Sequence, residues 1–112
     1  MIALTHFRLD AEASEESFTG RAEVALSALA KRPGYLRGTL ARSLDDPEAW
    51  TLLTEWESVG AYRRALGNFE VRLHATALLA GALDLPSAFE PLVDIGPDGD
   101  RRTRRSDRSE ER

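Results

Sequence analysis

The chain has 112 residues, enough for one domain and too few for two, and its 42% hydrophobic and 30% charged residues suit a soluble globular protein. It contains no cysteine, which excludes disulfides, thiolate metal sites and cysteine nucleophiles, and its formal net charge of −4 argues against nucleic acid as a partner. No run approaches the roughly 18 apolar residues that a membrane span requires, and the first residues lack the features of a secretion signal. We therefore expect a cytoplasmic protein with no membrane partner.

The chain opens with a predicted strand followed by a predicted helix. Residues 2–9 alternate so that two largely apolar faces result, which predicts a strand covered on both sides. Residues 14–31 predict a helix, because Ser14 is a good N-cap and acidic residues occupy the first turn, where the helix dipole favours them. Pro33 and Gly34 end this helix. Its apolar stripe consists of Phe18, Ala22, Ala25, Leu26 and Leu29.

A hairpin of two strands is predicted next. Residues 35–44 are rich in Arg, Thr and Gly, which indicates a less buried strand at an edge of the sheet. The sequence Asp-Asp-Pro-Glu at residues 45–48 is a turn signal. Residues 50–57 alternate again with period 2, so they should form the second, antiparallel strand of the hairpin.

The stretch of residues 50–66 organises the rest of the chain. Its hydrophobic period changes from 2 to 3.6 at Ser58, which can cap the helix that follows, and no real loop intervenes. The strand therefore ends with Trp56 beside a helix that carries Tyr62. Two such amphipathic aromatic residues could line a pocket, or they could simply be core and rim residues.

The remaining segments are a helix, a strand and a tail. Residues 69–79 predict a helix whose apolar stripe contains Val71, Ala75 and Leu78, and His74 falls on the same stripe. Residues 87–95 predict a last strand, placed at an edge or carrying a bulge because Pro91 cannot donate a ladder hydrogen bond. Residues 96–112 have a charged composition of low complexity, so we expect a disordered tail after a domain of residues 1–95.

This order of elements predicts an α+β fold. Two strand–helix–strand crossovers around a central hairpin give a ferredoxin-like split β-α-β with a four-stranded antiparallel sheet. Right-handed crossovers place the helices on one face of the sheet. The other face would then expose apolar side chains to water, and a second copy of the chain is the simplest cover, so we expect a homodimer.

The sequence around these elements resembles a known family. The order of elements, the PGYLRG sequence, the DDPEAW hairpin and the TEWES…AYRRAL junction resemble the antibiotic biosynthesis monooxygenase family over residues 2–95. The resemblance implies a dimeric α+β barrel, with two sheets packed face to face. It also implies a small apolar pocket between each sheet and its own helices.

The resemblance further implies a chemistry and a set of site residues. Quinone-forming members of the family oxidise phenolic rings of polyketides with molecular oxygen, without metal or flavin, and use a pocket Trp, Asn, Tyr and Arg. Trp56 and Tyr62 match the family's Trp and Tyr, whose N–H and O–H groups can stabilise a substrate anion. The Asn expected four residues before the Trp is Leu52 here, and Arg72 either supplies the positive charge or is a solvated surface residue.

A haem-degrading branch of the same fold is the less favoured implication. That branch needs a helical His as iron ligand, an Asn on the first strand and a Trp on a helix. His74 is the one plausible axial ligand in its region, but the first strand has no Asn and the AYRRAL helix has no Trp. We therefore expect no cofactor and no metal, with His74 lining the pocket, where it could act as a general base.

Together these patterns lead to one functional hypothesis and one alternative. The hypothesis is a cofactor-independent monooxygenase acting on a small aromatic molecule, a polyketide-like phenol, with Trp56, Tyr62 and His74 as candidate catalytic residues. Phe7, Leu52 and Arg72 are candidate substrate-binding residues. The alternative is a non-catalytic dimeric barrel that binds a ligand. An enclosed pocket with convergent polar groups favours the enzyme, and a pocket plugged by side chains favours the alternative.

Overall fold

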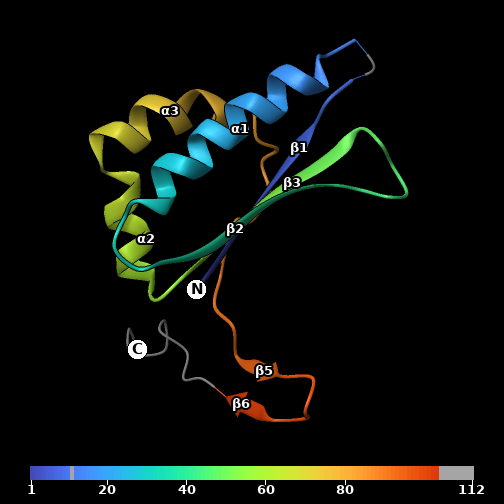
Figure 1. Cartoon of the computed structure of the whole chain (residues 1–112). Coiled ribbons are helices and arrows are strands. Elements are labelled where there is room, and N and C mark those ends of the chain that lie inside the picture. Colours follow the sequence, from blue (N-terminus) through green and yellow to red (C-terminus); the bar gives the residue numbers. More distant parts are fainter. Residues whose placement is uncertain (11, 104–112) are drawn as a thin grey trace.

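The computed structural model describes residues 1–10 and 12–103, and its centre is a four-stranded sheet in the order β2-β3-β1-β4 (Figure 1). All pairings in this sheet are antiparallel. In chain order the elements are β1 (Ile2–Arg8), α1 (Glu15–Ala30), β2 (Tyr35–Arg42), β3 (Ala49–Trp56), α2 (Val59–Leu66), α3 (Phe69–Leu79), β4 (Ala88–Phe89), β5 (Val93–Ile95) and β6 (Arg101–Thr103). The predicted α+β, ferredoxin-like fold is therefore confirmed.

The helices begin where side chains can accept the first free backbone N–H groups. Ser14, Ser58 and Asn68 cap α1, α2 and α3 by accepting from the amides of Ser17, Ala61 and Val71. Glu15 and Glu16 occupy the first turn of α1, as the sequence pattern indicated. These local signals explain why the helix starts were predictable to within a residue.

Strand β3 shows why one face of the sheet forms the core. Trp50, Leu52, Thr54 and Trp56 are all buried, whereas the residues between them are half-buried. Figure 1 shows α1 and α3 on the same side of the sheet, and α1 packs against both α3 and β2. Alanines make up much of the buried face of α1, and such small side chains let neighbouring elements approach closely.

The opposite face of the sheet carries no helix. The register pairs Leu4 with Leu53 and Ile2 with Phe89, so these side chains lie on the face away from Trp56. Leu4, Leu53 and Ile2 are half-buried, and Phe89 is 43% exposed. An apolar strip therefore runs across three strands, as the alternation in β1 and β3 predicts.

The C-terminal part differs from the sequence prediction. The single strand expected over residues 87–95 is two short strands, β4 and β5, separated by residues 90–92, which include Pro91. Strand β4 lies at the edge of the sheet, as Pro91 suggested. Residues assigned to a disordered tail form β6, which pairs with β5 in a two-stranded hairpin, and residues 104–112 lie outside the described residues. In Figure 1 this hairpin extends away from the helices and the main sheet.

Candidate active site

Trp56 is the centre of the candidate site. It is the last residue of β3, it is only 1% exposed, and its side chain lies on the helix-covered face. Its Nε1 donates a hydrogen bond of 2.8 Å to Oγ1 of Thr54. This bond forms because residues two apart in a strand point to the same face. The indole N–H is therefore satisfied within the protein and is not directed at an open space.

Tyr62 lies beside Trp56, as the sequence predicts. The two ring centroids are 5.7 Å apart and the ring planes are inclined by 55°. The Ser58 cap fixes the start of α2, so Tyr62 comes about one helical turn after this cap. Burial raises the pKa of Tyr62, which keeps the phenol protonated at neutral pH as a hydrogen-bond donor.

Tyr35 is a third member of this cluster, and sequence reasoning missed it. Its ring meets Trp56 edge to face, with centroids 5.3 Å apart and planes at 85°. Burial raises its pKa as well. A Cβ placed on Gly38 would lie 2.4 Å from the Tyr35 hydroxyl oxygen, so the phenol occupies space that only glycine leaves open. The signal in the sequence was an aromatic residue directly after a Pro-Gly turn with a glycine three residues later.

The hydroxyl groups of Tyr35 and Tyr62 have no hydrogen-bond partner within residues 1–10 and 12–103. Both phenols flank one indole whose own N–H is already bonded to Thr54. The free donors at this cluster are therefore the two phenol hydroxyls and not the indole N–H. Because the indole is enclosed in the single chain, a ligand reaches its face only if one of the tyrosines moves aside.

Leu52 and Phe7, the predicted substrate-binding residues of the sheet, take different positions. Leu52 is buried in the middle of β3, where it adds apolar surface and no hydrogen-bonding group. Phe7 pairs with Trp50 at the far end of β3 and contacts Phe18, with ring centroids 5.2 Å apart. Trp50 and Trp56 are six residues apart, or about 20 Å along a strand. The structure therefore does not bring Phe7 to the Trp56 cluster.

His74 and Arg72 are both exposed residues of α3. His74 lines two surface hollows between α1 and α3, of about 280 and 440 Å³, with Gly20 and Val24 of α1. The expectation that His74 faces the same pocket as Trp56 does not match this placement. The buried face of α3 is centred on Val71, Ala75 and Leu78, and His74 falls at the border of that stripe, on the side that turns to solvent.

Two further observations concern metal binding and membrane spans. Within residues 1–10 and 12–103, no group of three or more His, Asp or Glu side chains is arranged to hold a metal ion. None of the helices in that same part is both long and apolar enough to cross a membrane.

Comparison with known proteins gives one family and a consistent fold. A family model described as antibiotic biosynthesis monooxygenase matches residues 1–76. A point mutant of SnoaB, a cofactor-independent oxygenase from Streptomyces nogalater, is 27% identical with a TM-score of 0.64, over 73% of this chain and 82% of that one. Another SnoaB structure is 26% identical with a TM-score of 0.64, over 81% and 94% of the two chains.

A more distant structure supports the fold alone. Rv0793 from Mycobacterium tuberculosis is 16% identical with a TM-score of 0.66, over 85% of this chain and 97% of that one. No curated protein sequence matches this chain significantly.

Proposed function

The chain belongs to the antibiotic biosynthesis monooxygenase family, and from this premise we propose that it is a cofactor-independent monooxygenase that oxidises an aromatic, polyketide-like phenol with molecular oxygen. The likeness to SnoaB, at 27% identity, supports this activity. In the proposed reaction one atom of O2 enters the ring as a quinone oxygen and the other leaves as water. The phenol supplies the electrons and two hydrogen atoms, so substrate plus O2 gives quinone plus water.

The observation that carries the proposal is the contact between Trp56 and Tyr62 at the end of β3. A phenol loses its proton before it gives an electron to O2, so the site must stabilise a phenolate. A protonated Tyr62 hydroxyl, held in a water-poor environment, donates to that oxygen and is worth more there than in water. We assign Tyr62 as the primary donor, because the Trp56 N–H is bonded to Thr54.

Trp56 then has a different role from that of Tyr62. Its indole provides a flat apolar wall against which a planar ring can stack once the Tyr62 side chain rotates away from it. Leu52 stands where the family's Asn is expected, so the missing amide donor has to come from another side chain. Tyr35, which also contacts the indole, is a group that can meet this need.

The direct test is oxygen consumption by the purified protein with a panel of polycyclic phenols. Under ¹⁸O2, the expected product gains one labelled oxygen and loses two hydrogens, as read by mass spectrometry. Dialysis against a chelator should leave the rate unchanged if no metal takes part. Absence of oxygen uptake with every phenol that binds to the protein would contradict the proposal.

A non-catalytic ligand-binding protein is the second candidate. Two observations favour it: Leu52 at the expected Asn position, and a Trp56 indole enclosed by packed side chains. In that case phenols should raise the melting temperature without consuming oxygen.

We also propose that the chain forms a homodimer through the helix-free face of the sheet. The apolar strip of Ile2, Leu4, Leu53 and Phe89 supports this arrangement. Leu53→Glu places a charge in the middle of that strip and should convert a dimeric mass to a monomeric one by light scattering. Leu44→Glu is the control, because Leu44 is fully exposed in the β2–β3 turn. A monomeric wild-type protein at micromolar concentration would refute the dimer.

A further inference from the structure

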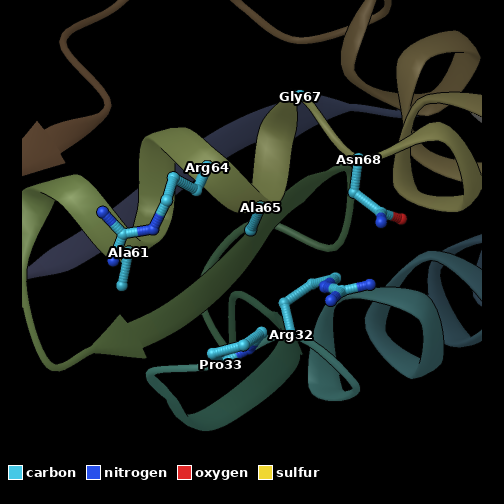
Figure 2. Close-up of a pocket in the computed structure, with 7 residues that line it drawn as sticks. All are labelled: Arg32, Pro33, Ala61, Arg64, Ala65, Gly67 and Asn68. Carbon is cyan, nitrogen blue, oxygen red and sulfur yellow. The ribbon is translucent and has the colours of Figure 1, made fainter.

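A separate pocket of about 330 Å³ lies where α1 ends and α2 meets α3 (Figure 2). Three segments that are distant in the sequence form it: the end of α1 with its following turn, one face of α2, and the link to α3. The lining residues are Arg32, Pro33, Ala61, Arg64, Ala65, Gly67 and Asn68. Trp56 and Tyr62 are not among them, so the pocket is distinct from the candidate active site.

The floor of this pocket is apolar and firmly held. Ala61 and Ala65 are one helical turn apart on α2 and both are buried. Gly34 packs so closely on this face that a Cβ added to it would lie 2.5 Å from the Ala61 Cβ. Gly34 also has a φ of 90°, which side chains rarely adopt, so the turn beneath the pocket depends on glycine. Small side chains on a fixed backbone thus leave room that cannot readily close.

The rim of the pocket is positive. Neither Arg32 nor Arg64 makes an ion pair or a side-chain hydrogen bond within the described part of the chain, whereas Arg8, Arg37 and Arg42 are each paired with a carboxylate. Figure 2 shows the two arginine side chains at opposite ends of the pocket, with the Arg64 guanidinium lying back along α2 over Ala61 and the Arg32 guanidinium extending the other way, below Asn68. Two unpaired cations around one hollow stand out in a chain whose net charge is −4.

The acidic residue in the first turn of α3 is already paired. Glu70, in the first turn of α3, is 3.8 Å from Lys31 and so has its own counter-charge. Asn68 caps α3, and the positive end of the helix dipole faces the same region. A helix end alone would be a weak attraction, but here it adds to two guanidinium groups that can each bind an oxyanion through paired N–H donors.

We infer that this pocket binds a small organic oxyanion, with the side chains of Arg32 and Arg64 turning inward to hold its carboxylate or phosphate group and a compact apolar body on the floor of Ala61, Ala65 and Pro33. Its volume lies at the small end of the range for ligand pockets, which suits a single ring. The inference stands apart from the proposed oxygenase activity, because binding here needs neither the Trp56 cluster nor oxygen.

The test is titration of the full chain with benzoate, followed by the backbone amide signals of Gly67 and Asn68 in NMR spectra. We expect saturable shifts with a dissociation constant of about 1 mM or tighter. Benzamide, which has the same shape without the charge, should bind at least about tenfold more weakly, as loss of a charge-assisted hydrogen bond predicts. Phenyl phosphate in place of benzoate decides which oxyanion is preferred.

Matched arginine variants locate the site. Arg32→Gln and Arg64→Gln should each weaken benzoate binding about tenfold. Arg63→Gln removes the same charge from the next residue, which is exposed and does not line the pocket, so it should change binding by less than about twofold at physiological salt. The variants' NMR spectra report folding independently of binding.

Four results would overturn the inference. These are the absence of saturable shifts at Gly67 and Asn68, equal binding of benzamide, an equal loss in Arg63→Gln, and inorganic phosphate binding as tightly as benzoate. The last result would mean that the apolar floor contributes nothing to the binding of benzoate.

Discussion

Strand β3 carries two tryptophans on the same face, and their surroundings differ. Trp50 lies among the phenyl rings of Phe7 and Phe18, and the guanidinium of Arg42 covers it at 5.3 Å from the ring centroid. Trp56 lies between two tyrosines. Among the described residues the Trp50 N–H has no hydrogen-bond partner although it is buried, whereas the Trp56 N–H is bonded to Thr54. One end of the strand is therefore mainly aromatic packing, and the other combines packing with free phenol hydroxyl groups.

This difference indicates which end can do chemistry. At the Trp50 end the phenyl rings offer only apolar surface and the indole N–H, unpartnered within the described residues, is buried beneath them, so we expect this end chiefly to stabilise the fold. The phenols at the Trp56 end present donors to whatever displaces one of them. Identical residues at equivalent strand positions thus have different roles because of the side chains that other elements bring to them.

The largest expected effect is on stability at the Trp50 end. Phe18→Ala removes a ring that contacts both Phe7 and Trp50, and should lower the free energy of unfolding by about 3–5 kcal/mol. Chemical denaturation measures this loss. A loss below about 1 kcal/mol would mean that the Trp50 end is not a packed core, and the contrast between the two ends would fail.

The next effect is on turnover at the Trp56 end. Tyr62→Phe removes only a hydroxyl group, so it should lower turnover of a phenol substrate about ten- to a thousandfold while unfolding changes little. Trp56→Phe makes the apolar wall smaller and should lower turnover by a similar factor. The control is Phe18→Leu, which alters packing at the other end of β3 and should retain turnover in the folded protein. Normal turnover in a Trp56→Phe/Tyr62→Phe double variant would remove both residues from the mechanism.

A smaller effect is expected when the Trp56 N–H loses its hydrogen-bond partner, as the Trp50 N–H already lacks one among the described residues. Thr54→Val keeps the side-chain shape but removes the acceptor for the indole N–H, and should cost about 1–3 kcal/mol of unfolding free energy. Thr51→Val, on the opposite face of the same strand, is the matched control and should have little effect, since Thr51 makes no side-chain hydrogen bond within the described residues. Equal stability of the two variants would show that the indole bond contributes nothing.

The smallest effect is a pH dependence confined to the Trp56 end. Burial raises the pKa of Tyr62 above its ordinary value of 10.0, so the folded protein holds this proton where the unfolded chain releases it. Stability linked to Tyr62 is therefore complete below about pH 10 and falls as the pH rises from there towards the folded-state pKa. Comparing urea unfolding of wild type and Tyr62→Phe across this range should show a shallower decline in the variant. Identical declines would place the titrating group elsewhere.

The sequence by itself determined the elements from β1 to α3 and their layering, but not the C-terminal strands, because short strands such as β5 and β6 carry no periodic pattern. Alternation in β1 and β3, and the caps Ser14, Ser58 and Asn68, are local signals, because the backbone geometry of strands and helices imposes them within a few residues. The same locality explains why Trp56 and Tyr62 were predicted as neighbours: six residues and one strand–helix junction separate them. The helix-free apolar face also followed from the alternation.

Only the tertiary structure decided which side chains surround each tryptophan. Tyr35 reaches Trp56 through the pairing of β2 with β3 and through the space above Gly38, and neither is visible in a local pattern. His74 lies at the border of a helical stripe, so its direction depends on how α3 packs against α1, and that packing turns it outward. The anion pocket likewise joins Arg32 to Arg64 across three elements. The periodicity of the sequence shows which face of each element is buried. It does not show which side chains of different elements meet, because that depends on how the elements pack together.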